Sequence, residues 1–191
     1  ATVYFRDIRS LTGTRTEEIS IFGGASTYSK YENSDFAFVK GLVLSLNYFD
    51  FKGLSLNMNY TLQQAKGTAS SPSQAWSASQ GGGLAETYMI PLDWDQMHTM
   101  SMIVSYVQDT YGVSLIGTIG SGLPYTPDSS NNISMLIQNS EQKPFTTNFD
   151  VKSYYNFKLG DNFIQVYFNI SNLFNHLNQT NVYSDSGVAD Y

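Results

Sequence analysis

The chain has 191 residues, no cysteine and a net charge of -6, which excludes a disulfide framework or a thiolate metal site and disfavours nucleic acid as a partner. Charged residues make up only 14% of the chain and aromatic residues 15%, whereas about a quarter of a typical globular protein is charged. No run of 18 apolar residues occurs, so a helical membrane span is excluded.

The first predicted strands cover 2–11 and 26–38, the second being an outer extension of the strand that follows it. Between Gly41 and Gly67 the sequence then alternates with period two, which predicts a β-hairpin with one apolar and one polar face. The apolar positions are all even: Leu42, Leu44, Leu46 and Tyr48 on the first arm, and Leu54, Leu56, Met58, Tyr60 and Leu62 on the second.

Four later segments repeat this alternation, at 98–108, 111–120, 148–160 and 162–174. The apolar positions are even in the first of them, odd in the next two and even again in the last. The chain thus predicts about seven or eight antiparallel strands, each near the ~10 residues that a tilted membrane-spanning β-strand needs. The expected fold class is all-β, a partial transmembrane β-barrel of meandering strands.

The connections alternate between short and long. Short turns are expected at 49–53, 108–112 and 159–163, and long stretches rich in Gly, Ser, Pro and Asn at about 67–97 and 120–146. For apolar sets to share a face, the first hairpin loop must have an odd number of residues and the next two an even number. A two-residue turn at Asp161 and Asn162, or a four-residue version, satisfies the last requirement.

Period two alone does not separate a lipid-facing barrel from a soluble barrel with an apolar interior. Two features favour lipid. The polar face of the first hairpin carries Ser, Asn, Thr and Gln without any charge, and aromatic residues gather beside the short turns, as in the girdle of an outer-membrane barrel. These aromatics are Tyr48, Phe49, Phe51, Tyr106, Tyr111, Phe157 and Phe163.

Candidate sites for chemistry are sparse. His98 with Asp93 and Asp95 invites comparison with a hydrolytic triad, but no G-x-S-x-G motif occurs, and a hydrogen-bonded histidine at the start of a strand is the simpler interpretation. A membrane-embedded hydrolase would need a nucleophile that the sequence does not offer. We therefore expect no catalytic residue, metal or cofactor.

Four aromatic residues lie in or beside the long connections: Trp76, Tyr88, Trp94 and Tyr125. Loops over a rigid scaffold are where recognition usually occurs, and aromatic rings stack on glycans and peptides. These residues are candidate ligand-binding residues. Anchoring at the membrane interface is an equally good interpretation.

A series of motifs carries a family resemblance. "PLDWDQMHTMSM" is followed by "YGVSLIGTIGSGLPYTP" and then by "FDVKSYYNFKLGDNFIQVYFNISNLFNHLN". In this order the motifs resemble the C-terminal part of the β-barrel of TonB-dependent outer-membrane receptors, especially the group with a carboxypeptidase-like regulatory domain. "YFRDIRSLTGT" and "YENSDFAFVKGLVLSL" resemble the two preceding strands, so the resemblance covers nearly all of residues 1–191. Met97 departs from it, since a basic residue is common there.

The resemblance implies a function. The chain would be the C-terminal portion of a receptor barrel of about 22 strands, with the plug, the TonB box and the earlier strands absent. Such a receptor lies in the bacterial outer membrane and takes up a bulky nutrient, such as a glycan, peptide, siderophore or cobalamin, through its lumen when the TonB complex acts on the plug. Its partners would be outer-membrane lipid, the TonB complex and the extracellular nutrient. The alternative is a small self-contained outer-membrane barrel of about eight strands, acting as a pore or a structural protein.

Overall fold

The computed structural model of the chain describes residues 1–14, 19–24, 26–50, 52–80, 88–128, 138–160 and 162–190. Its elements are β1 (Thr2–Thr14), β2 (Ile19–Ile21), η1 (Phe22–Gly24), β3 (Ser26–Tyr28), β4 (Tyr31–Phe49), β5 (Leu54–Gly67), α1 (Gln74–Gln80), β6 (Ile90–Pro91), β7 (His98–Val107), β8 (Tyr111–Gly120), β9 (Pro124–Tyr125), β10 (Glu141–Gln142), β11 (Thr146–Leu159) and β12 (Asn162–Ile170).

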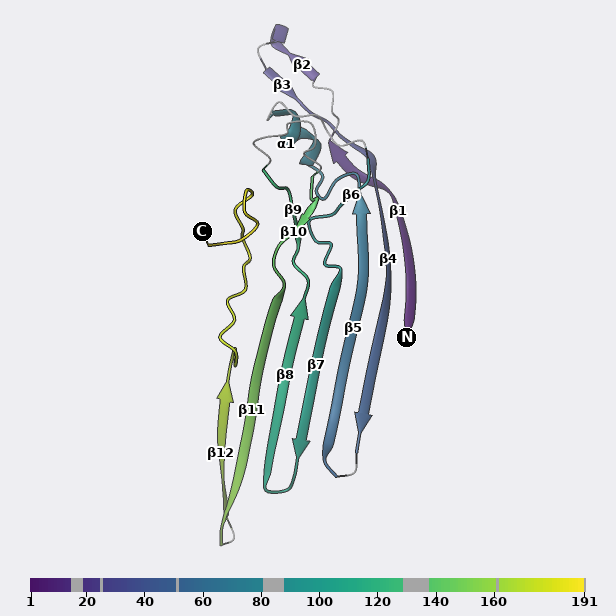
Figure 1. The fold of residues 1–191 in the computed structure, drawn as a ribbon. Coiled ribbons are helices and arrows are strands. Elements are labelled where there is room, and N and C mark those ends of the chain that lie inside the picture. Colours follow the sequence, from purple (N-terminus) through teal and green to yellow (C-terminus); the bar gives the residue numbers. More distant parts are fainter. Residues whose placement is uncertain are drawn as a thin grey trace.

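One antiparallel sheet dominates the fold. Its strand order is β1-β4-β5-β7-β8-β11-β12, with β6 paired to the end of β5, so the strands form a meander. Figure 1 shows these strands side by side in a single layer, with β1 at one edge and β12 at the other. The prediction of an all-β antiparallel meander is confirmed, and the sheet is open, because β1 and β12 do not pair with each other.

The register agrees with the parity of the sequence. Leu44 pairs with Tyr60 in the first hairpin, Val104 with Leu115 in the second and Phe157 with Ile164 in the third. The apolar sets therefore share one face, as period two predicts.

The loop lengths follow from the register. The last pairs of the three hairpins are Phe49 with Ser55, Val107 with Gly112, and Leu159 with Asn162. They enclose an odd number of residues in the first loop and an even number in the other two, as predicted. The exact position of the last turn was wrong by one residue: Asn162 already belongs to β12, and the turn begins at Gly160, whose φ of +60° suits glycine. Asp161 lies outside the described residues.

The short and long connections lie at opposite ends of the sheet. The three short turns gather at one end, whereas α1, β6, β9 and the β2–β3 hairpin lie at the other, here called the long-loop end (Figure 1). The long connections are more structured than the sequence indicates, because α1 and β6 lie between β5 and β7, and β9 pairs with β10 between β8 and β11. No helix in the described ranges is long and apolar enough to cross a membrane.

After β12 the chain continues without a regular strand through the described residues to 190, yet it covers part of the β11 edge. The Thr147 N–H donates to Asn178 Oδ1 at 2.8 Å, and Asn178 Nδ2 donates to the Thr147 carbonyl at 2.9 Å. The Leu173 N–H donates to the Phe149 carbonyl at 2.7 Å. An asparagine side chain thus replaces the backbone of a neighbouring strand at this edge.

Candidate functional site

A broad apolar face extends across the sheet. Equivalent positions on neighbouring strands form rows, such as the row of Leu46, Met58, Met102, Gly117 and Phe149. The face is exposed from one side of the sheet to the other: Leu44 on β4 is 42% exposed, Val113 on β8 44% and Ile164 on β12 53%. A contiguous apolar surface of this extent is typical of a surface that contacts lipid or another protein.

The opposite face is polar and nearly uncharged over β4 to β8. Ser45, Asn59, Ser101, Thr118 and Asn148 form one row that continues onto β11. Amide side chains are linked along the first hairpin, where Asn57 donates to Asn47 and Asn59 donates to Asn57. Between β7 and β8 the hydroxyl groups of Ser105 and Ser114 lie 2.8 Å apart. Side chains of this kind can line a hydrated lumen without creating a strong field.

Aromatic rings cover glycines on neighbouring strands at three places. Tyr4 lies opposite Gly41 and Tyr154 opposite Gly112 on the polar face, and Phe149 lies opposite Gly117 on the apolar face. A Cβ built on any of these glycines would lie 2.4–2.6 Å from the ring. The missing side chain therefore makes room for the ring, which shields the backbone that glycine leaves bare.

The small buried core lies on the polar face at the long-loop end. Ala37, Val39 and Ala65 from β4 and β5 contact Leu92 from the connection after β6, with Tyr4 and Ile8 packed beside them. The core fixes the long connection to the sheet.

Asp95 supports this core. It is only 3% exposed, and its Oδ1 accepts the Ala65 N–H at 2.8 Å. Burial raises the pKa of Asp95 above its usual value, and the Ala65 hydrogen bond and the charge of Lys66 oppose the rise. The Asp95 N–H donates to the Leu92 carbonyl at 2.7 Å, so Asp95 links the connection after β6 to β5.

The four predicted ligand-binding aromatics all lie at the long-loop end, on separate elements. Trp76 lies in α1, where its backbone N–H donates to Thr14 Oγ1 at 3.0 Å, and Tyr125 lies in β9. Tyr88 precedes β6 and Trp94 follows it, and each is 47% exposed. The structure brings the four to one end of the sheet without showing that they line a common pocket, so their role as ligand-binding residues is a prediction.

Asn139 joins two of the long connections, and the sequence analysis missed it. Its Nδ2 donates to the Pro91 carbonyl at 2.8 Å and to Asp93 Oδ1 at 2.7 Å, while its N–H donates to Thr126 Oγ1 at 3.0 Å. Its φ of +59° is a conformation that asparagine tolerates better than most residues. An asparagine among loop residues carries no periodic signal, so only the structure shows this link.

His98 is the first residue of β7, and its Nδ1 lies 2.7 Å from the Tyr60 hydroxyl, with the two rings stacked. The prediction of a hydrogen-bonded histidine at the start of a strand is confirmed. Within the described ranges, no group of three or more His, Cys, Asp or Glu side chains is arranged to hold a metal ion.

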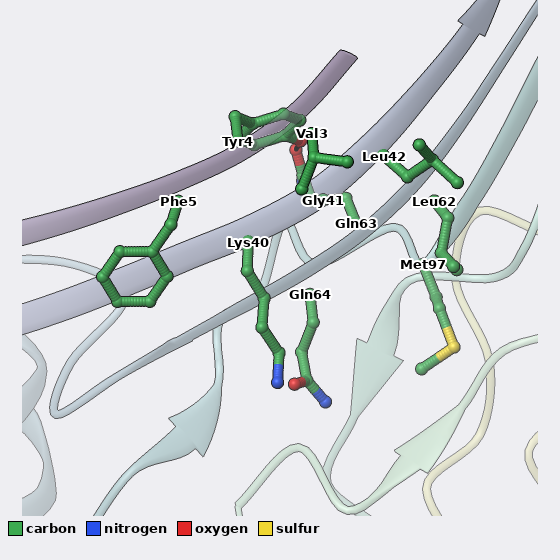
Figure 2. A pocket seen from close by; sticks show the side chains of 10 residues that line it. All are labelled: Val3, Tyr4, Phe5, Lys40, Gly41, Leu42, Leu62, Gln63, Gln64 and Met97. Atoms are coloured by element: carbon green, nitrogen blue, oxygen red, sulfur yellow. Dashed lines mark hydrogen bonds between the residues drawn. The ribbon is translucent and has the colours of Figure 1, made fainter. Parts of the chain in front are cut away.

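A groove of about 460 Å³ lies over β1, β4 and β5 toward the long-loop end (Figure 2). Six of its lining residues share the apolar face by register: Val3, Phe5, Lys40, Leu42, Leu62 and Gln64. The alternation predicts the apolar residues of this set. The groove itself depends on how β1, β4 and β5 are placed in space, and the sequence carries no signal for it.

Comparison of the chain with protein-family models, with curated proteins and with solved structures gives no match.

Proposed function

We propose that the chain forms one section of the wall of a transmembrane β-barrel in the bacterial outer membrane, within a TonB-dependent type of receptor. The observation that carries this proposal is the apolar face, which is continuous across the strands and which the described chain leaves exposed. Lipid is the environment that makes such a face favourable, because burial of apolar surface stabilises by about 25 cal/mol per Å².

The dimensions of this face support the proposal. β7 and β8 have 10 residues each and β12 has 9, and a tilted strand needs about 9–11 residues to cross the bilayer. β4 is longer, with 19 residues, and its even positions from Phe36 to Tyr48 are apolar except for Lys40. At the long-loop end β4 extends past the ends of β7 and β8 (Figure 1).

The open sheet favours a large barrel over the small self-contained one. Lipid does not tolerate unpaired backbone groups, so β1 and β12 need further strands as neighbours in a bilayer. A receptor barrel supplies those strands. The alternative, a complete pore of about eight strands, requires β1 to pair with β12, and they do not pair here.

Nutrient uptake is the function that the family resemblance supports. The long connections, with Trp76, Tyr88, Trp94 and Tyr125, would face the outside and capture a bulky ligand such as a glycan, peptide or siderophore. The short turns would then face the periplasm. The TonB complex would act through a plug domain that is not among these residues.

Single cysteines test the membrane placement, because the chain has none of its own. In the full-length protein in vesicles, a fluorophore at position 44, 46, 56 or 58 should be quenched by lipids with brominated chains. A fluorophore at position 45, 47, 57 or 59 should not be quenched. If the odd positions were quenched, or neither set, the barrel and the receptor function would both be wrong.

A second test separates the receptor from the small barrel. Residues 1–191 alone, exported and refolded in detergent, should not give a heat-modifiable, protease-resistant monomer if β1 and β12 need other strands. Formation of such a monomer would support the small barrel.

A further inference from the structure

The groove on the apolar face is lined by apolar side chains and by the positively charged Lys40. Val3, Leu42 and Leu62 provide apolar walls, and Lys40 lies between Phe5 and Gln64 in the same cross-strand row. In Figure 2 the side chains of Lys40 and Gln64 point the same way. The groove is thus nearly all apolar, and Lys40 is the one charged residue among those that line it.

The positive charges of this face gather at one end. By register, Lys66 follows Gln64 on the same face, two positions farther toward the long-loop end than Lys40. The nearby carboxylate of Asp7 is already paired with Arg9 at 2.7 Å. Lys152 and Lys158 have the opposite parity to the apolar set of β11 and lie on the other face. A lipid on the apolar face therefore meets these lysines toward the long-loop end.

We propose that this groove binds one anionic phospholipid-type molecule, with an acyl chain along Val3, Leu42 and Leu62 and its phosphate at Lys40. The proposal rests on the lipid-facing placement argued above and adds a specific lipid class. The groove is continuous with the lipid-facing surface, and the lysine stem can lie along the apolar wall while its ammonium group reaches the headgroup layer. Lys66 provides a second charge two positions farther toward the long-loop end.

The test measures local lipid enrichment. The intact protein carries a fluorophore at Leu44→Cys, on the same face beside the groove but not among its lining residues, and is reconstituted in phosphatidylcholine containing a minority of phosphatidylglycerol, with bromine on the chains of one lipid or the other. Quenching by brominated phosphatidylglycerol should exceed its share of the bilayer by about fivefold, the preference that one lysine near a headgroup gives. A fluorophore at Val113→Cys, farther along the same face, should show no such preference.

Charge variants identify the residue responsible. Lys40→Gln should reduce the enrichment at position 44 to the bulk ratio, and Lys40→Arg should keep it. Lys152→Gln, on the opposite face, is the matched control and should leave the enrichment unchanged. Enrichment that survived Lys40→Gln, or that was absent in the unmodified protein, would overturn the proposal.

Three further outcomes separate this proposal from the alternatives. If millimolar glycerol 3-phosphate removed the enrichment, the groove would bind a free phosphate and the lipid assignment would be wrong. If both lipids quenched positions 44 and 113 in proportion to their amounts, the lipid site would fail while the membrane placement stood. If neither lipid quenched either position, the membrane placement itself would fail.

Discussion

Replacing Gly41 with alanine would place a methyl group where the Tyr4 ring lies. The new Cβ would be 2.6 Å from Cζ and Oη of Tyr4 and 2.7 Å from the Leu62 carbonyl oxygen. The ring can rotate away only by breaking the hydrogen bond of 2.8 Å from the Tyr4 hydroxyl to Gln63 Oε1. The carbonyl is held by the strand ladder and cannot move independently.

The expected effect on stability combines three contributions. Overpacking costs about 1–3 kcal/mol, and loss of the hydrogen bond costs about 1 kcal/mol. Alanine in a strand recovers about 0.5–1 kcal/mol relative to glycine. Gly41→Ala should therefore lower the free energy of unfolding by about 1–3 kcal/mol.

Urea unfolding of the reconstituted full-length protein, followed by tryptophan fluorescence, measures this change. Tyr4→Phe removes only the hydroxyl group and should cost about 1 kcal/mol. A double mutant, Tyr4→Ala with Gly41→Ala, should be less destabilised than the sum of the single mutants, because removal of the ring relieves one of the two clashes. A neutral or stabilising Gly41→Ala would falsify the argument that the ring needs the space over this glycine.

Leu44→Arg in the full-length protein in vesicles should destabilise by about 2–4 kcal/mol if Leu44 faces the bilayer midplane, whereas Asn57→Arg on the polar face should cost much less; equal costs in urea titrations would contradict the assignment of faces. Asp95→Asn should change the pH dependence of stability: because the folded pKa of Asp95 is raised, the wild type should lose stability relative to this uncharged variant as the pH rises from about 4, the ordinary pKa of the unfolded state, through the raised folded pKa. A stability difference between the two proteins that stayed constant with pH would show that the Asp95 pKa is not raised. Asn178→Ala removes both side-chain hydrogen bonds to Thr147, so the Thr147 amide should exchange with deuterium at least several-fold faster, while amides paired between β7 and β8 keep their rates.

The sequence predicts the sheet well because the strand period is a local property. Leu44, Val104 and Phe157 each belong to alternating segments whose parity determines which residues can share a face, and the register follows once the loops are short. Whether the edge strands β1 and β12 pair with each other is not a local property, and the alternation of apolar residues carries no information on it.

The long connections were predicted less well. α1 lies inside a stretch expected to be a loop, since a helix of seven residues without an apolar stripe gives no helical periodicity. Asp95 and Asn139 act through contacts with distant backbone groups, and such contacts leave no pattern along the chain. The groove could not be predicted from the sequence for the same reason. Its charged residue, Lys40, occupies an even position in a series that is otherwise apolar up to Tyr48.

The scarcity of buried side chains has a consequence for biogenesis. Among the described residues, the buried aliphatic side chains are Ala37, Val39, Ala65, Ile90 and Leu92, all near the long-loop end. Burial of side chains within the chain thus contributes little free energy to the folding of the remaining strands in water. On the proposed placement, the chain would cross an aqueous compartment unfolded, available to holding chaperones, and the bilayer itself would trigger its folding. Transfer of apolar side chains from water to lipid, rather than packing of side chains against one another, would then determine when the strands assemble.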